Sequence, residues 1–250
     1  MKVATRVFAA VLGLAFFAGS AAAQLVNLPV ITYPAGYQGL MIRADFGTGL
    51  NNDSKINSSI SSKPMAFGGM VGFGSKMFNI NAGAAYLNTR DPELKKPIEF
   101  GGNVGVTVLN KAEMPVAVNV FAGAGYVAVK DTTAGSPSVK VLNVPFGVGV
   151  AFSPPMTGDV GVSIWAAPRG QYLSQDASDL PGEEKVNRFG FGVSGGVNVH
   201  FAQGIGIYAA LDWSTFAEKT TSLFTYAKMS PLYFGGGLSY TFTLPGMGME

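Results

Sequence analysis

Hydrophobic and polar residues alternate one by one along most of this chain, and short turn-forming stretches separate the alternating segments. Within 115–129, Val116 and Val118 share one side of an extended chain, whereas Asn119 and Phe121 share the other. A period of two residues is typical of β-strands whose two faces meet different surroundings. The pattern predicts ten strands, at 39–47, 65–74, 78–88, 97–109, 115–129, 139–152, 160–172, 188–201, 205–214 and 231–242.

The segments between these strands also alternate in character. Longer, polar segments occupy 48–64, 89–96, 130–138, 173–187 and 215–230, and shorter ones lie near Ser75, at 110–114, at 153–159 and at 202–204. In consecutive antiparallel strands every second connection lies at the same end, so one end carries the longer loops and the other the tight turns. The sequence therefore predicts an all-β fold, a closed antiparallel up-and-down barrel of ten strands, with eight strands as the nearest alternative.

The two faces of the predicted strands differ in charge. The apolar face carries no charged residue, whereas the opposite face carries Gly, Ser and Asn residues together with a few charged ones. A soluble barrel would turn its apolar face inward and would need a well-solvated exterior, which a glycine-rich face does not supply. Because a charge facing lipid at mid-membrane costs about 2–4 kcal/mol, an uncharged apolar face suits a bilayer. We therefore expect a transmembrane barrel with its apolar face outward.

Aromatic residues on the predicted outward face gather near both ends of the strands. Those near the longer loops are Phe46, Tyr86, Phe100, Tyr126, Tyr172, Phe189 and Trp213, and those near the short turns are Phe73, Phe78, Phe152, Phe201, Tyr240 and Phe242. Aromatic rings prefer the two interfaces of a membrane, so two belts around an aliphatic band favour the transmembrane interpretation. Ordinary strand propensity also enriches aromatic residues, but it does not explain their position at the strand ends.

The first 23 residues have the features of a cleavable secretory signal. Lys2 and Arg6 precede the apolar stretch 7–17, and small residues lead to a cleavage site after Ala23. The apolar stretch is too short for a membrane-spanning helix, which needs about 20 residues. We expect a signal peptide at 1–23, an N-terminal segment at 24–37, the barrel at 38–243 and a C-terminal tail at 244–250.

Composition narrows the classes of function. The chain has no Cys and a single His, which excludes disulfide scaffolds, thiolate metal sites and metal sites with several imidazoles. Charged residues make up 13% and hydrophobic residues 48%, which is the opposite of the balance in a disordered chain. Without Lys2 and Arg6 the basic and acidic residues balance, so no excess of positive charge points to nucleic acid. We expect no metal, no cofactor and no nucleic-acid partner.

The last predicted strand carries an ending that is found in one family. Gly237 followed by Tyr240-Thr241-Phe242 fits the Gly-x-x-Φ-x-Φ portion of an assembly signal, where Φ is a hydrophobic or aromatic residue. With the secretory signal, the even strand number and the alternating loops, the chain resembles bacterial outer-membrane β-barrel proteins, over about residues 38–242. Two features depart from that pattern: Gly235 stands where the family prefers a polar residue, and 244–250 extend past the final aromatic residue.

This resemblance implies a place in the cell and a set of partners, without indicating a subfamily. It implies insertion into the bacterial outer membrane by the barrel-assembly machinery, with outer-membrane lipids and lipopolysaccharide around the barrel. The longer loops would then lie outside the cell, and the short turns and the segment 24–37 would lie in the periplasm. That segment contains Pro29 and Pro34 and does not have the pattern of a spanning strand. The sequence leaves two alternatives open for it: a cap on the periplasmic opening or a loosely ordered segment.

Two short motifs suggest chemistry that the predicted strands do not support. Residues 190–195 match the glycine fingerprint of dinucleotide-binding folds, and residues 192–196 match the nucleophile elbow of serine hydrolases. Both motifs require a strand that enters a helix, whereas the strand pattern continues here. Ser194 and His200 lie on one face of the same strand, about 20 Å apart, too far for a hydrogen bond. We expect no catalytic residue and no enzyme activity.

Charged residues of the predicted inward face all lie in the half of the barrel that is nearer the longer loops. They are Arg43, Asp45, Glu99, Arg169, Arg188 and Asp212. Because buried charges must be paired, we expect them to form a charge network that ties strands together across a narrow interior. The alternative is a charged constriction that filters small solutes.

The width of the interior leaves both of these possibilities open. An eight-stranded barrel is just filled by its side chains, and ten strands lie close to that limit. Many inward positions are glycines, and the large inward side chains that could fill the resulting gaps are Phe121, Trp165, Arg169, Tyr208 and Tyr233. The expected function is a structural role or the narrow passive passage of small solutes. Recognition or adhesion through the outer loops is the alternative, and no loop partner is indicated.

Overall fold

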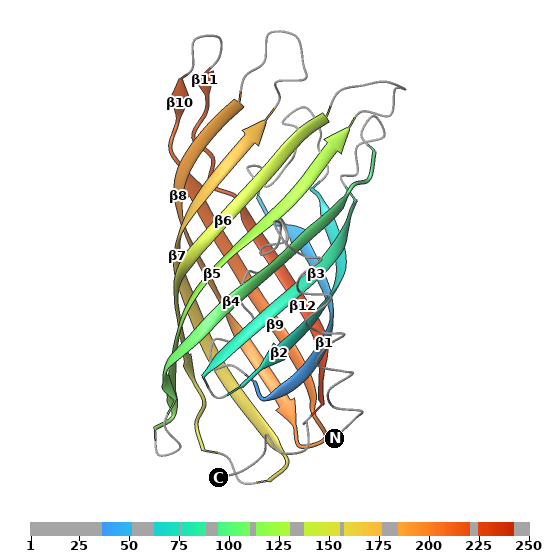
Figure 1. Ribbon diagram of the computed structural model, residues 1–250, viewed down its shortest axis with the longest axis vertical. Helices are drawn as coiled ribbons and strands as arrows, with labels where there is room; N and C mark the ends of the chain where they lie inside the picture. The colour runs from blue at the N-terminus through green and yellow to red at the C-terminus, as the bar shows by residue number, and fades with distance from the viewer. Residues whose placement is uncertain are drawn as a thin grey trace, which may run out of the picture.

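Ten long strands form one closed antiparallel barrel in the computed structural model, which describes residues 37–51, 63–75, 77–88, 95–110, 114–130, 138–155, 158–176, 185–220 and 225–242 (Figure 1). The strands are β1 (Gly39–Gly49), β2 (Met65–Gly74), β3 (Phe78–Asn88), β4 (Ile98–Asn110), β5 (Val116–Lys130), β6 (Ser138–Phe152), β7 (Val160–Asp176), β8 (Lys185–Phe201), β9 (Ile205–Phe216) and β12 (Leu232–Phe242). Pairing of β1 with β12 closes the barrel. No helix in the described part of the chain is long and apolar enough to cross a membrane.

The predicted all-β barrel of ten antiparallel strands is confirmed, and the eight-stranded alternative is wrong. Most strand ends lie within a few residues of the predicted ones. β7 and β8 are longer than predicted, because they remain paired as far as Asp176 and Lys185. The segment 215–230, predicted as a loop, contains the short strands β10 (Lys219–Thr220) and β11 (Thr225–Tyr226), which pair beyond the end of β9 at the upper left of Figure 1.

Connections between the strands alternate between the two ends of the barrel, as predicted. The long-loop end carries the connections 50–64, 89–97, 131–137, 177–184 and 217–231, and the short-turn end carries 75–77, 111–115, 153–159 and 202–204. The contrast in length is smaller than predicted at one place, since 153–159 is as long as 131–137. Pro154 and Pro155 lack the backbone N–H that a tighter hairpin would use.

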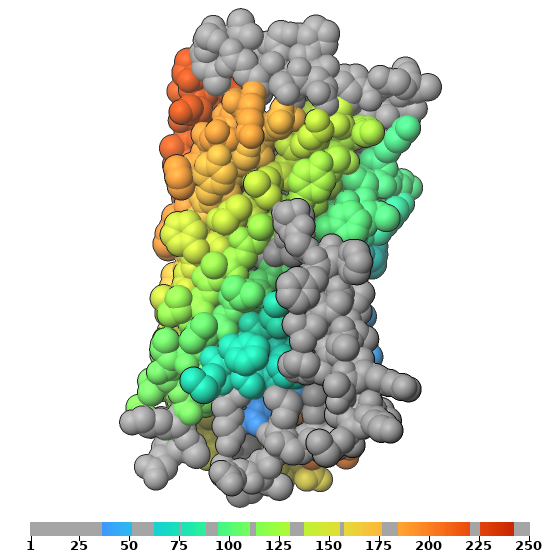
Figure 2. All heavy atoms as spheres, in the orientation of Figure 1, coloured from blue at the N-terminus to red at the C-terminus, as the bar shows by residue number. Residues whose placement is uncertain are grey.

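Solvent exposure of the strands settles which face points outward. Val120, Val148 and Val197 are 47%, 40% and 41% exposed, whereas Asn119 on the opposite face of β5 is only 2% exposed. The apolar face therefore forms the exterior, as predicted, and the polar and glycine-rich face lines the interior. Figure 2 shows the side chains of β4, β5 and β6 (green to yellow-green) covering the outer surface side by side.

The outer surface has the predicted aromatic belts, but the prediction that its strands carry no outward charge is wrong at Lys140, which lies within the predicted strand 139–152. Charged residues on the outward face of the long strands are confined to the long-loop ends, at Lys130, Lys140, Asp176 and Lys185. Ring pairs lie near both ends: Phe46–Phe67, Tyr172–Phe189 and Phe191–Trp213 near the loops, and Phe73–Phe78 and Tyr240–Phe242 near the turns. An aliphatic band thus separates two aromatic belts, as expected for strands that cross a bilayer.

Candidate functional site

All six charged residues that were predicted to face the interior are buried there. Their exposed fractions are 8% for Arg43, 5% for Asp45, 0% for Glu99, 1% for Arg169, 6% for Arg188 and 2% for Asp212. Four of them form two ion pairs, Arg43 with Asp45 and Arg169 with Asp212.

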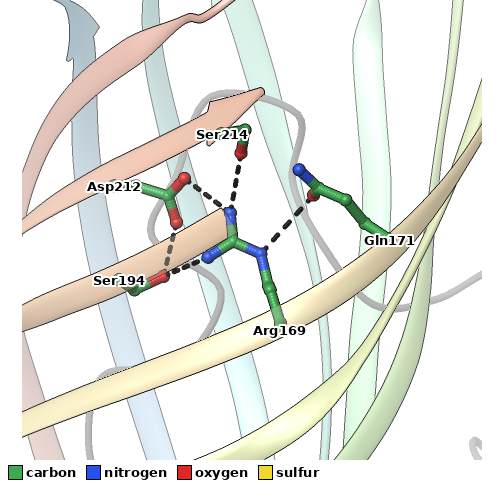
Figure 3. Close-up of polar contacts among 5 residues, drawn as sticks. All are labelled: Arg169, Gln171, Ser194, Asp212 and Ser214. Atoms are coloured by element: carbon green, nitrogen blue, oxygen red, sulfur yellow. Dashed lines mark hydrogen bonds and ion pairs between the residues drawn. The ribbon is translucent and has the colours of Figure 1, made fainter. Parts of the chain in front are cut away.

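The first ion pair lies within a network of polar side chains on β7, β8 and β9 (Figure 3). The Nη2 of Arg169 donates to Oδ1 of Asp212 at 2.7 Å and to the Ser214 hydroxyl at 3.0 Å. Its Nη1 donates to the Ser194 hydroxyl at 2.8 Å, and its Nε donates to Oε1 of Gln171 at 3.4 Å. We call these five residues the Arg169 cluster. Acceptors on three strands therefore surround one guanidinium that water does not reach.

Backbone register explains how Arg169 reaches two strands away. Arg169 is paired with Gly192 on β8, and Gly192 is paired with Ser214 on β9, so the three residues form one row across the sheet. A Cβ atom at Gly192 would lie 2.9 Å from Cζ of Arg169. The guanidinium therefore passes over the bare backbone of Gly192 to bind Ser214 and Asp212.

The second ion pair lies within β1, and a tyrosine of β9 is bonded to it. Nε of Arg43 lies 2.7 Å from Oδ1 of Asp45, the next inward residue of β1. The Tyr208 hydroxyl donates to the same carboxylate at 2.5 Å, and the Arg43 guanidinium lies 5.2 Å from the centre of the Tyr208 ring. We call these three residues the seam cluster, because Tyr208 on β9 reaches β1 across β12. Gly237 on β12 lies between them in the row Tyr208–Gly237–Asp45.

Several other inward glycines also lie next to a large side chain. A Cβ atom at Gly237 would lie 2.6 Å from the Tyr208 ring, and one at Gly105 would lie 2.5 Å from the amide of Asn119. At Gly190 it would lie 2.5 Å from the Phe216 ring. These glycines therefore do not leave the open gaps that the sequence suggested, because neighbouring side chains occupy the space.

A group of apolar side chains is buried in the barrel interior. Phe121, Trp165 and Tyr208, three of the residues expected to fill it, form a buried cluster with Ala151, Ala167 and Ala210. None of these six residues is more than 5% exposed. These side chains therefore contact one another inside the barrel and do not merely line an open channel.

Glu99 and Arg188 belong to neither ion pair. Glu99 is fully buried on β4, and its carboxylate and that of Asp212 both interact electrostatically with Tyr233. Arg188 lies nearer the long-loop end, where it donates to Gln175, to the backbone oxygen of Ala227 and to Sδ of Met229. Its guanidinium also lies 5.7 Å from the centre of the Phe216 ring.

Ser194 and His200 do not come together. Ser194 is fully buried and donates its hydroxyl proton to Asp212 at 2.5 Å. His200 lies at the short-turn end of β8, with its ring against Gly161 of β7. Ser194 is thus held between the Asp212 carboxylate and the Arg169 guanidinium, and His200 lies toward the other end of β8. In the described residues no three His, Cys, Asp or Glu side chains are grouped as a metal ion would require.

Sequence analysis missed a group of amide side chains in the short-turn half of the interior. Nδ2 of Asn81 donates to Oδ1 of Asn103 at 2.9 Å and to Oδ1 of Asn79 at 3.3 Å. The Tyr37 hydroxyl donates to Oδ1 of Asn81 at 2.6 Å. The alternate positions of Asn79 and Asn81 could have indicated an inward polar group. Nothing in the sequence pointed to their partners, Asn103 on β4 and Tyr37 before β1.

The chain is similar to several solved structures of bacterial proteins. The β domain of the Bordetella autotransporter BrkA shares 10% identity, covers 83% of this chain and 100% of its own, and has a TM-score of 0.48. The outer membrane protease OmpT from Escherichia coli shares 11%, with coverages of 83% and 95% and a TM-score of 0.38. The translocator domain of the autotransporter NalP from Neisseria meningitidis shares 11%, with coverages of 82% and 89% and a TM-score of 0.48.

No protein-family model matches the chain, and no curated protein is similar to it in sequence. With identities near 10% and TM-scores below 0.5, none of these likenesses extends to the activity of the other protein.

Proposed function

We propose that this protein is an integral β-barrel of the bacterial outer membrane with a structural role, and that its filled interior does not conduct solutes. The observation that carries the proposal is the sidedness of the strands. Apolar residues such as Val148 are outward and exposed, whereas Arg169 and Asp212 are inward and buried. Such an exterior suits acyl chains, and a closed barrel leaves no unpaired strand edge in lipid.

Packing of the interior supports the structural role over passage. The apolar cluster around Phe121, Trp165 and Tyr208 is buried in the barrel interior. The Arg169 cluster lies next to it toward the long-loop end, with its charges matched by partners on neighbouring strands. A small solute would have to displace both layers to cross, and paired buried charges are costly to separate.

Planar-bilayer recording of the purified protein tests this function. We expect no single-channel steps for the wild type, and none for Arg169→Ala. Trp165→Ala serves as the positive control, because loss of the largest side chain from the central cluster is the change most expected to admit ions. Wild-type steps that Arg169→Ala abolishes would contradict the structural role and would identify the interior as a charged filter.

Recognition through the outer surface is a second candidate. It is favoured because β7, β8 and the segment after β9 extend far at the long-loop end. β7 and β8 are the longest strands, and the hairpin β10–β11 continues beyond β9. Replacing residues 219–226 with a short glycine-serine turn leaves the ten barrel strands intact. If recognition is the function, this variant binds host cells or matrix proteins less than the wild type, with unchanged heat-modifiable migration in gels.

Outer-membrane lipid and lipopolysaccharide are the partners that this function implies. Lys130, Lys140 and Lys185 lie on the outward face at the long-loop ends of their strands, at the level where lipid headgroups are expected. The barrel-assembly machinery would insert the chain through its last strand, β12. The proposal includes no catalytic activity and no cofactor.

A further inference from the structure

The short-turn end of the barrel interior contains a contact that the structural role does not explain. Tyr37 precedes β1, yet its hydroxyl donates to Asn81 of β3 at 2.6 Å, inside the barrel. To make this contact the side chain crosses β2. Tyr37, which belongs to no strand, therefore links the start of β1 to β3 inside the barrel.

Two glycines of β2 provide the space for Tyr37. A Cβ atom at Gly72 would collide with the Tyr37 hydroxyl, and one at Gly74 would collide with the Tyr37 backbone oxygen and lie 3.0 Å from its ring. Gly72 is paired with Asn81, so the hydroxyl passes over Gly72 to reach its acceptor in the same row. Any larger residue at either position would exclude the tyrosine.

The backbone turn that directs Tyr37 inward depends on a third glycine. Gly39 has a φ of 110°, a conformation that residues with a side chain rarely adopt. It is the first residue of β1 and lies two positions after Tyr37. The chain can therefore turn from the wall of the barrel into its interior at this point.

Asn81 is held ready to receive the phenol. Its amide nitrogen donates to Asn79 and Asn103, which fixes its amide plane and leaves its oxygen as the acceptor for Tyr37. Burial raises the pKa of Tyr37 above the ordinary value, and the charge of Arg43 offsets this only in part. The hydroxyl therefore stays protonated, and a donor, across the range of physiological pH.

We propose that Gly72, Gly74 and Asn81 form an internal binding site for the side chain of Tyr37, and that this contact closes the short-turn end of the barrel interior. The site fits a planar phenol, because the backbone of Gly72 and Gly74 leaves space for the ring and the amide oxygen of Asn81 accepts a hydrogen bond from the hydroxyl. Release of Tyr37 exposes the inward residues near it, foremost Met41, which is paired with Gly72 and only 9% exposed. The central cluster stays in place, so the inference does not depend on whether the barrel conducts.

Thiol labelling tests the site directly, because the chain contains no Cys. Met41→Cys places a reporter beside Tyr37, and Leu87→Cys places a buried control at the long-loop end of β3. The probe is a membrane-impermeant methanethiosulfonate, applied to the folded, detergent-purified full chain. In the Met41→Cys background we expect Tyr37→Ala to raise the labelling rate more than tenfold. We expect Tyr37→Phe, which keeps the ring and loses one hydrogen bond, to raise it about fivefold.

Further variants separate the site from a general loosening of the barrel. Asn81→Ala should raise the rate at least as much as Tyr37→Phe, because it also removes the bonds to Asn79 and Asn103, and adding Tyr37→Phe to Asn81→Ala should raise it no further. Gly39→Ala should raise it as well, through the turn. Equal labelling of Met41→Cys with and without Tyr37→Ala would overturn the proposal. An equal rise at Leu87→Cys would also overturn it, since the whole barrel would then have loosened.

Discussion

Removing the carboxylate of Asp212 gives the clearest test of how the interior is held together. In Asp212→Asn the shape of the side chain is kept, but the Arg169 guanidinium, which is 1% exposed, loses its ion pair with Asp212. Breaking one side of a buried ion pair costs about 3–5 kcal/mol, because the remaining charge is left in a poorly polarisable interior. Ser194, Ser214 and Gln171 still accept hydrogen bonds from Arg169, so we expect a loss near 3 kcal/mol, at the lower end.

Urea unfolding of the barrel in lipid vesicles, followed by tryptophan fluorescence, measures this loss. The two tryptophans suit the assay, since Trp165 lies inside the barrel and Trp213 packs against Phe191 on the outside. Ser214→Ala is the matched control: it removes one hydrogen bond to the same guanidinium and should cost about 1.5 kcal/mol. The double variant Arg169→Met with Asp212→Leu removes both charges and should cost less than Asp212→Asn.

Two results would refute this reasoning. A cost for Asp212→Asn no greater than that of Ser214→Ala would mean that the carboxylate contributes only an ordinary hydrogen bond. A double variant that loses as much as Asp212→Asn would mean that shape, rather than charge pairing, holds β7 to β9.

Three further predictions concern substitutions inside the barrel and on its outer face. Each is measured as a change in the free energy of unfolding. Gly192→Ala should cost about 1–3 kcal/mol, because its Cβ lies 2.9 Å from Arg169, whereas Gly195→Ala, whose nearest atom is 3.4 Å away, should be tolerated. Val148→Arg, at the middle of the outward face, should cost about 2–4 kcal/mol in vesicles, and Val160→Arg at the short-turn end about 0–1 kcal/mol. Tyr208→Phe should cost about 1.5–3 kcal/mol through its bond to a carboxylate.

The period-two pattern was sufficient to predict the barrel and which face points outward. Each strand alternates apolar and polar residues according to the surroundings of its two faces, so its own sequence shows both. The pattern failed at the ends of β7 and β8 for a physical reason. Beyond the apolar band the outward residues are polar, such as Asp176 and Lys185, while Val186 is apolar and buried on the inward face, so the pattern of the spanning part no longer holds. Backbone pairing continues there regardless, since hydrogen bonding does not require a hydrophobic face.

Partners of the inward charges were much harder to predict than their burial. The pair Arg43 and Asp45 lies on one strand and could be read from spacing alone. Arg169 and Asp212 lie two strands apart, and their meeting depends on the register of both intervening pairings. A slip of one residue in either pairing would turn a partner to the lipid face. The loops that fix those registers carry no signal strong enough to set them from sequence.

Glycine on the inward face has a different meaning from the one that composition suggests. Three long side chains reach a second strand by passing over a glycine in the same row or next to it: Arg169 over Gly192, Tyr208 over Gly237 and Tyr37 over Gly72. In each case the missing Cβ allows a polar group to reach an acceptor beyond the adjacent strand. Glycine next to a long polar residue therefore indicates cross-strand bonding and a filled interior, whereas only glycines without such a neighbour would widen a channel. A count of inward glycines alone cannot separate a pore from a packed barrel; their pairing with Arg, Tyr and Asn can.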